Sequence, residues 1–392
     1  MKTEEFEMIA KTFQGLEAIL AKELTDLGAG NVKVLKQGVG FTGDLEMLYK
    51  ANFYCRTALR ILRPLCRFKA ENTDEVYEKV REFDWTAFVD PSRTLAVDSV
   101  VFSDNFKHSK FLAYRVKDAI ADFFYEKIGK KPSVRVVRPD LQLNIHVDQD
   151  DCTLSIDSSG ESLHKRGYRV AQIGTPLNEV MAAGLLLLAG WNGKTNLLDP
   201  MCGSGTILIE AAMIALNIAP GLYRSEFAFE RWSDFDKEMF ERLYNDESKE
   251  RRFYHKIYGS DISPKAIAAA EKNIKNAGLG KYISLEVAPF QNLSKPAKKT
   301  MLLFEPSHYD RSDYDLYELY ATIGAKLKRH YIGMNAWVFV IPGAASEKIG
   351  LHSSQKIKLS NGATQYELWK YEIFNFKEKK NDFVRYGGTL RR

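Results

Sequence analysis

An apolar strand, a glycine loop and a helix follow one another in the stretch LLDPMCGSGTILIEAAMIAL, residues 197–216. The strand ends at Asp199, and Gly203 and Gly205 stand where the helix begins. Glycine lets the backbone approach a ligand closely and adopt positive φ, and the first turn of a helix offers free N–H groups. Because ligands of open α/β sheets bind outside the carboxyl ends of the strands, this order predicts a ligand-binding edge, with an ordinary turn as the alternative.

Strands and helices alternate through the second half of the chain. The predicted strands are NLLDP, KIYGSDI, ISLEV, MLLF and AWVFVIP, with helices between most of them. This alternation predicts an α/β fold with a doubly wound, mostly parallel sheet. The first part of the chain instead shows short alternating strands around a few helices, which is typical of an α+β region. We therefore predict an N-terminal piece at 1–63, a second α+β domain at 64–157, a basic linker at 158–172 and the α/β domain at 173–392.

Composition narrows the class of protein. Of the 392 residues, 45% are hydrophobic and 27% are charged, which are ordinary globular values. No apolar run is long enough to cross a membrane, and the N-terminus carries acids where a signal peptide carries bases. The four cysteines form neither a metal-ligand pair nor a disulfide pattern. We expect a cytoplasmic protein with no metal and no membrane partner; the sequence leaves its oligomeric state open.

Positive charge gathers in the later part of the chain. Residues 1–160 contain 23 Lys and Arg against 25 Asp and Glu, a net charge of −2, whereas residues 161–392 contain 33 against 26, a net charge of +7. A basic excess of this size is mild, so composition alone gives only modest support for a nucleic-acid partner.

The glycine loop differs from a dinucleotide-binding loop. Its third glycine position holds Leu208, and Asp199 and Pro200 precede it, a combination that resembles the loop of class I methyltransferases. The aminoacyl end of S-adenosylmethionine needs no phosphate cradle, and its cationic amine favours an acid at the strand end. Asp261 ends the next predicted strand, where it would bind the ribose hydroxyls or, alternatively, cap the following helix. It lies 56 residues beyond the last glycine of the loop, which predicts an insertion within residues 217–254.

Four motifs occur together in this chain: DPMCGSGTILIEAA, GTPLNEVMAAGLLLLAGW, LHKRGYR and YGSDIS. In combination they resemble the bacterial THUMP-domain RNA methyltransferases, in particular the large-subunit ribosomal RNA guanine-N2 methyltransferases, over nearly the whole chain. The resemblance implies a ferredoxin-like N-terminal piece, a THUMP RNA-binding domain and a Rossmann-like class I methyltransferase domain. It also implies S-adenosylmethionine as the cofactor and structured, ribosomal RNA as the substrate.

The resemblance further implies a cofactor site, residue by residue. The loop corresponds to Asp199, Cys202, Gly203, Ser204, Gly205 and Thr206, the ribose acid to Asp261 followed by Ile262, and the segment closing over the methionine end to Thr175, Pro176 and Leu177. The family often holds the adenine edge with an acid after the third strand. This chain reads VAPFQNL there, so Phe290 is expected to stack on adenine, with Gln291 in place of the acid.

The predicted strand MLLF is followed by Glu305, Pro306, Ser307 and His308, at the positions where the family carries Asn-Pro-Pro-Tyr. In the family, the Asn side chain and a Pro carbonyl accept hydrogen bonds from an exocyclic amine, and the ring stacks on a base taken out of its helix. Glu305 can accept N–H bonds when ionised, with His308 or Tyr309 stacking on the base, so these residues are candidate catalytic residues. The alternative is that the changed tip is a non-catalytic turn.

Two basic groups are candidate RNA contacts, because basic residues with aromatic neighbours suit phosphates and stacked bases. The first group lies in the second α+β domain and contains Lys107, Lys110 and Arg115, together with His108 and Lys117. The second lies in the linker and contains Lys165, Arg166, Tyr168 and Arg169. A plain solvated face is the alternative for the first group, whereas the second matches a family motif.

Three functions are compatible with these observations. The leading hypothesis is S-adenosylmethionine-dependent methylation of an exocyclic base amine in structured RNA, most specifically guanine N2 in large-subunit ribosomal RNA, with adenine N6 left open. The second is an RNA-binding protein that keeps the methyltransferase fold but has lost catalysis at the Glu305–His308 tip. The third is a small-molecule methyltransferase, against which the large N-terminal region argues.

Overall fold

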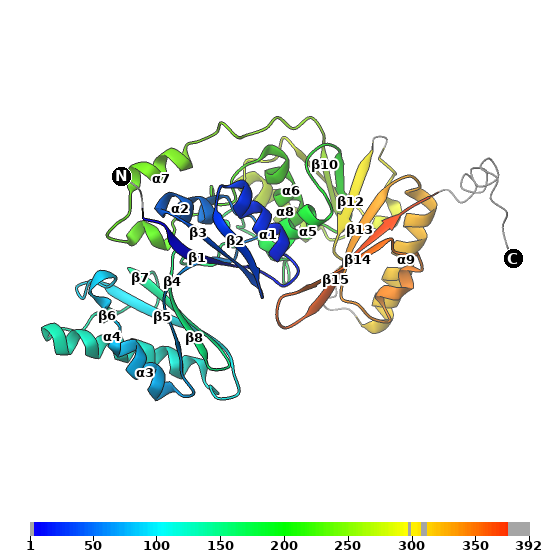
Figure 1. Ribbon diagram of the computed structural model, residues 1–392. Helices are drawn as coiled ribbons and strands as arrows, with labels where there is room; N and C mark the ends of the chain where they lie inside the picture. Colours follow the sequence, from blue (N-terminus) through cyan, green and yellow to red (C-terminus); the bar gives the residue numbers. More distant parts are fainter. Residues whose placement is uncertain (1–3, 297–298, 307–311, 375–392) are drawn as a thin grey trace, which may run out of the picture. The chain divides into compact units, whose positions relative to one another are not determined.

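The computed structural model describes residues 4–296, 299–306 and 312–374, which form two compact units (Figure 1). The first unit contains residues 4–12, 20–165 and 224–246, and the second contains the other described residues. The sequence predicts an α/β domain from 173 to 392 with an insertion within residues 217–254, and the structure packs residues 224–246, here called the inserted segment, within the first unit.

One mixed sheet runs through the first unit. Its strands are β1 (Phe6–Lys11), β2 (Gly30–Leu35), β3 (Gly38–Gly43), β4 (Arg60–Lys69), β5 (Thr94–Phe102), β6 (Ser133–Val134), β7 (Leu141–Asp148) and β8 (Asp151–Asp157), in the spatial order β2-β3-β1-β4-β8-β7-β5-β6. β4 joins the two halves of the sheet because it pairs with β1 on one side and β8 on the other. The predicted boundary between residues 63 and 64 therefore falls inside a strand. The register of β4 shifts after Pro64, which has no N–H to donate to the ladder.

Helices cover this sheet with their apolar faces. The helices in this part of the chain are α1 (Glu17–Asp26), α2 (Leu45–Tyr54), α3 (Thr73–Glu82) and α4 (Ser109–Ile128), and the inserted segment adds α7 (Lys237–Tyr244). Leu112, Val116 and Ile120 recur at helical spacing along α4 and are buried with Leu143 of β7 in one core. α4 is followed by Gly129, whose φ of 68° is the left-handed conformation common after a helix.

The inserted segment packs on α2 through aromatic rings. Phe229 stacks on Tyr49 with ring centroids 4.5 Å apart, and Phe240 meets Phe53 edge-on at 5.9 Å. The backbone N–H of Asp236 donates a hydrogen bond to the Tyr49 hydroxyl at 3.0 Å. These contacts make the segment part of the core of the first unit.

The second unit has the predicted doubly wound α/β architecture. Its strands are β9 (Asn196–Asp199), β10 (Ile257–Asp261), β11 (Ile283–Val287), β12 (Thr300–Phe304), β13 (Asn335–Val340), β14 (Gln355–Ser360) and β15 (Gln365–Glu372), in the order β11-β10-β9-β12-β13-β15-β14. The first five are parallel, and β15 and β14 add an antiparallel edge. The helices are α5 (Glu179–Leu188), α6 (Thr206–Leu216), α8 (Pro264–Asn276) and α9 (Asp313–His330). The predicted fold class is confirmed.

β9 lies between β10 and β12, and the strand order reverses there. The three parallel strands therefore bring Asp199, Asp261 and the residue after Phe304, Glu305, to one edge of the sheet. Such a switch point is where ligands of open α/β sheets bind.

α6 follows β9 directly and is buried on every side. A helix that is apolar all round belongs in the interior, which explains its sequence TILIEAAMIAL. None of the helices in the described part of the chain combines the length and the apolar character needed to cross a bilayer.

Candidate active site

Asp199 ends β9 with its carboxyl group buried. Its Oδ1 accepts a hydrogen bond from the backbone N–H of Met201 at 3.1 Å. Burial raises the pKa of Asp199 well above its ordinary value, and the neighbouring carboxyl groups of Asp261 and Glu305 raise it further. A cationic partner would stabilise the ionised form, so this position suits a ligand amine.

Asp261, at the end of β10, is tied to the glycine loop. Its Oδ2 accepts the N–H of Gly203 at 3.0 Å, and its Oδ1 accepts the N–H of Ser263 at 2.9 Å. Ser263, rather than Asp261, caps α8 with its side chain. The carboxyl group remains half-buried, and the next side chain, Ile262, is 67% exposed. An accessible acid followed by an accessible apolar residue suits a ribose and an adjoining aromatic base.

The two loop glycines have different reasons to be glycine. Gly203 has φ of 53°, and a Cβ built there meets no atom within 4 Å, so the backbone is open to a ligand on that side. Gly205 has φ of 86°, and its Cβ would lie 3.2 Å from the Cβ of Ala270 on α8. The first glycine leaves room for a ligand, and the second lets two helices pack closely.

These residues fit S-adenosylmethionine, which has a cationic amine, ribose hydroxyls and an adenine ring. The buried acid Asp199 suits the amine, the half-buried acid Asp261 suits the ribose hydroxyls, and the exposed Ile262 beside it suits the adenine ring. The N-cap of α6 is Gly205, which makes no side-chain capping bond, so the helix N-terminus is uncapped by side chains. When bound, the cofactor supplies an electrophilic methyl group.

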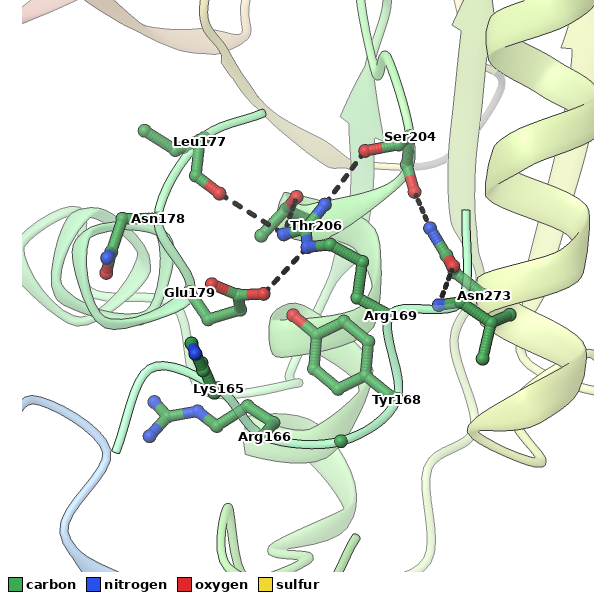
Figure 2. Close-up of polar contacts among 12 residues, drawn as sticks. Lys165, Arg166, Tyr168, Arg169, Leu177, Asn178, Glu179, Ser204, Thr206 and Asn273 are labelled. Atoms are coloured by element: carbon green, nitrogen blue, oxygen red, sulfur yellow. Dashed lines mark hydrogen bonds and ion pairs between the residues drawn. The ribbon is translucent and has the colours of Figure 1, made fainter. Parts of the chain in front are cut away.

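Arg169 of the linker lies beneath this loop instead of facing solvent. Figure 2 shows its guanidinium among Glu179, Ser204, Thr206 and the carbonyl of Leu177. Leu177, predicted with Thr175 and Pro176 to close over the methionine end, thereby shares a partner with the cofactor loop. Cys202 is buried in the same loop, and Asp199 and Asp261 add to the burial that raises the pKa of its thiol.

Three of the predicted RNA contacts are enclosed by protein. Arg166 is 2% exposed and pairs with Glu210 at 3.4 Å, and Tyr168 is fully buried with its hydroxyl 3.1 Å from the same carboxylate. Arg169 is 15% exposed and makes the four hydrogen bonds described above. The structure does not support RNA binding by these side chains, because none of them reaches the surface freely. Lys165 is exposed and forms a surface ion pair with Glu161.

Phe290 also differs from its expected role. Its ring is 3% exposed and stacks on Tyr331 at 5.8 Å between centroids, and it tilts against Phe304 at the same separation. The structure therefore does not support stacking on adenine, since both neighbours belong to the core of the second unit.

The basic group of α4 is more exposed. Lys107 and Lys110 are open to solvent, while Arg115 bonds Asp74 at 2.7 Å. Exposed aromatic rings accompany them on the helix, Phe111 at 51% and Tyr114 at 58%. The helical spacing of the buried apolar residues of α4 was the available signal in the sequence, because Phe111 and Tyr114 lie outside that buried stripe and are therefore expected to be exposed.

Asn273 is a site residue that sequence reasoning missed. It is fully buried on α8 and binds the linker and the loop at once. Its Oδ1 accepts the N–H groups of Val170 and Ala171, and its Nδ2 donates to the carbonyls of Ala171 and Ser204. A polar residue seven positions after Ala266, on the apolar stripe of an amphipathic helix, was the available signal.

At the end of β12, Glu305 is half-buried and Pro306 is buried. Burial raises the pKa of Glu305 from 4.5 to about 7, so near neutral pH both its protonated and ionised forms are populated. Ser307 and His308, the other two residues of the candidate tip, lie outside the described residues.

Three models of known protein families match successive parts of the chain. A family model described as RMKL-like, methyltransferase domain, matches residues 166–369; models of the RlmL ferredoxin-like domain and of the THUMP domain match residues 7–62 and 70–157. The chain is 37% identical to a putative RNA methyltransferase, slr0064, of Synechocystis sp., over 93% of this chain and 96% of that relative. It is 38% identical to a ribosomal RNA large subunit methyltransferase K/L of Syntrophotalea carbinolica, over 92% of this chain but 52% of that relative.

The fold agrees with these matches. The solved structure of SMU.472, a putative methyltransferase complexed with SAH, superposes with a TM-score of 0.83 at 27% identity, covering 96% of this chain and 100% of that one. The glycine loop, its acids and the matching models define an S-adenosylmethionine-dependent methyltransferase. The chain belongs to the family of THUMP-domain class I RNA methyltransferases. It spans about half the length of the K/L relatives that it matches.

Proposed function

We propose that this protein methylates an exocyclic base amine in structured RNA, namely guanine N2 in large-subunit ribosomal RNA. A THUMP domain in the same chain and relatives named as ribosomal RNA large subunit methyltransferases support an RNA substrate. Guanine N2 is the amine methylated by the group that the motifs resemble. Since the chain spans half of the K/L relatives, their ribosomal substrate is carried over here as part of the proposal.

The observation that carries the chemistry is the position of Glu305, at the end of β12 beside the loop that follows β9. An amine that is to be methylated needs acceptors for its N–H groups, so that its lone pair faces the methyl group. The ionised carboxylate of Glu305 accepts such bonds. With a pKa of about 7, the same group can take the proton that the methylated amine releases near neutral pH.

The direct test is transfer of labelled methyl from S-adenosylmethionine to in vitro transcripts of large-subunit ribosomal RNA, followed by nucleoside analysis. We expect N2-methylguanosine at a defined position, and none in small-subunit transcripts handled identically. Methyladenosine as the product would refute the proposed base while keeping the amine chemistry. No product with any transcript, from protein that binds the cofactor, would contradict the proposal.

A second function, RNA binding without catalysis, is favoured by the departure of Glu305, Ser307 and His308 from the Asn-Pro-Pro-Tyr of the family. The triple variant Glu305→Asn, Ser307→Pro and His308→Tyr rebuilds that pattern. A wild type that binds RNA but is inactive, together with an active triple variant, would establish the second function.

A further inference from the structure

Arg169 makes four hydrogen bonds to two separate segments of the second unit, residues 177–179 and residues 204–206. Its Nε donates to Glu179 Oε1 at 2.8 Å, its Nη1 to Ser204 Oγ at 2.9 Å, and its Nη2 to Thr206 Oγ1 at 2.9 Å and to the Leu177 carbonyl at 3.3 Å (Figure 2). The planar guanidinium presents its donors in a fixed fork, so four partners around one plane are held in one geometry. The arginine therefore fixes the loop after β9 relative to the start of α5.

The network is enclosed and charge-balanced. The side chains of Arg169 and Glu179 are 15% and 7% exposed, and Ser204 and Thr206 are buried. Glu179 is the first residue of α5, next to the N-cap Asn178, where a negative charge is favourable. Because the cation already has a carboxylate partner, the two loop hydroxyls are not needed to neutralise it. Their role in the network is geometric.

A second contact holds the same loop from the other side. Asn273 donates to the Ser204 carbonyl at 2.9 Å and accepts from the backbone of Val170 and Ala171, directly after Arg169. The linker thus contacts Ser204 in two ways. Arg169 binds the Ser204 hydroxyl directly, and the backbone of Val170 and Ala171 binds Asn273, which in turn binds the Ser204 carbonyl. Gly203 and Gly205 flank Ser204, both with positive φ and both with large conformational freedom in an unrestrained chain.

We propose that Arg169 is a positioning residue for the cofactor: it holds the Gly203–Thr206 loop in its binding conformation before S-adenosylmethionine arrives. A glycine loop that is ordered in advance loses less entropy on binding, which raises affinity without any direct contact to the ligand. The basic linker residue that looks like an RNA contact acts instead on cofactor binding. The inference does not depend on which base is methylated, because cofactor binding is measured without RNA.

The central variant is Arg169→Lys, which keeps the charge beside Glu179 but cannot reach Ser204, Thr206 and Leu177 together. Binding of S-adenosylhomocysteine to the cofactor-free protein is measured by calorimetry, and amide hydrogen exchange is measured across residues 202–206 without ligand. We expect affinity to fall about tenfold, equivalent to 1.4 kcal/mol, within the range of couplings between residues in one network. Exchange of the loop amides should become faster.

The matched control is Arg166→Lys, a buried arginine of the same linker that pairs with Glu210 of α6. It should lower thermal stability to a similar degree or more, yet leave S-adenosylhomocysteine affinity within about twofold of the wild type when measured well below the unfolding temperature. An equal loss of affinity in both variants would show that general destabilisation, and not loop positioning, is responsible.

A second variant keeps the test valid if Arg169→Lys does not fold. Ser204→Ala with Thr206→Val removes both loop acceptors and leaves the Arg169–Glu179 pair intact. It should reproduce most of the affinity loss, and adding Arg169→Lys to it should cause little further loss, since both remove one interaction. Wild-type affinity together with wild-type amide exchange in this double variant would overturn the proposal.

Discussion

Two basic groups of this chain look alike in sequence but have opposite surroundings. Arg166 and Arg169 of the linker are buried against Glu210 and Glu179, whereas Lys107 and Lys110 at the start of α4 are open to solvent beside exposed aromatic rings. A buried cation with its own carboxylate organises the protein, and an exposed one is free to meet a phosphate. The number of basic residues does not distinguish the two groups. The difference is that α6 and α5 supply Glu210 and Glu179 as buried partners for the linker arginines. The first group should control stability and cofactor binding, and the second should control RNA binding and its salt dependence.

The largest effect should come from removing a buried charge partner. Arg166→Ala leaves Glu210 buried without its cation, and such losses cost about 3–5 kcal/mol of unfolding free energy. Lys165→Ala, one residue earlier, removes only an exposed ion pair and should cost under about 1 kcal/mol. Urea unfolding of both variants measures the difference. Equal unfolding free energies for the two variants would show that burial does not determine how much a basic residue of the linker contributes to stability.

A pair of asparagines on α8 sharpens the same distinction. Asn273→Ala removes four hydrogen bonds and leaves backbone groups of the linker and of Ser204 without partners, at a cost of about 2–3 kcal/mol. Asn276 lies on the same helix and bonds the Tyr168 carbonyl from an exposed position, so Asn276→Ala should cost under about 1 kcal/mol. Chemical denaturation provides both values. A larger loss of unfolding free energy in Asn276→Ala than in Asn273→Ala would show that burial does not determine the contribution of these hydrogen bonds to stability.

Because the pKa of Glu305 is raised, we expect the rate of methyl transfer and the free energy of unfolding to change in opposite directions with pH. Its pKa of about 7 lies above the ordinary 4.5, so the fold favours the protonated form, and its contribution to stability is lost as pH rises from about 4.5 through 7. The ionised form accepts the amine, so the rate of methyl transfer should rise up to about tenfold per pH unit below 7 and level off above it.

Glu305→Gln should abolish both responses while leaving cofactor affinity unchanged, and Glu286→Gln, an exposed glutamate of β11, should abolish neither. RNA affinity measured in the same buffers separates substrate binding from chemistry. A wild-type rate that is flat between pH 5.5 and 8 would remove Glu305 from the reaction, because this interval extends about 1.5 units below the expected midpoint and about one unit above it.

The smallest effect concerns the exposed group. Lys107→Ala with Lys110→Ala should weaken binding of RNA several-fold and reduce the log–log salt slope by about 1.5, because each phosphate contact on a single strand releases a counterion worth about 0.7 of slope. Lys33→Ala with Lys36→Ala removes the same charge from exposed positions, one in β2 and one in the turn after it, and should leave the slope unchanged. If both double variants flatten the slope equally, overall charge governs binding, and α4 has no special part in it.

The sequence predicted the framework of the site because its signals are local. A strand, a glycine loop and a helix within twenty residues define the loop, and the acid at the end of the next strand follows from the alternation of elements. The side-chain directions in the linker were not predictable in this way. Glu210, which receives Arg166, lies 44 residues further along, and Asn273, which binds Val170, lies 103 residues further along. Only the assembled fold shows that these partners meet.

Phe290 illustrates the same limit for an apolar residue. Its place after the third strand fits an adenine-binding ring, yet two aromatic residues from β12 and the end of α9, Phe304 and Tyr331, complete a stack around it. An aromatic residue at a strand end can face either the ligand or the core, and the spacing of residues along the chain is the same in both cases.

The inserted segment has a consequence for the order in which the protein is made. Tyr49 of α2 and Asp236 of the segment are 187 positions apart, yet they share a hydrogen bond within one core. A ribosome must therefore complete α5, β9 and α6 of the second unit before residues 224–246 can cover the aromatic side chains of α2. A nascent chain that stalls at the linker carries Tyr49 and Phe53 uncovered and is a target for chaperones and proteases. The two units are thus interdependent during synthesis, and neither corresponds to a continuous stretch of messenger RNA.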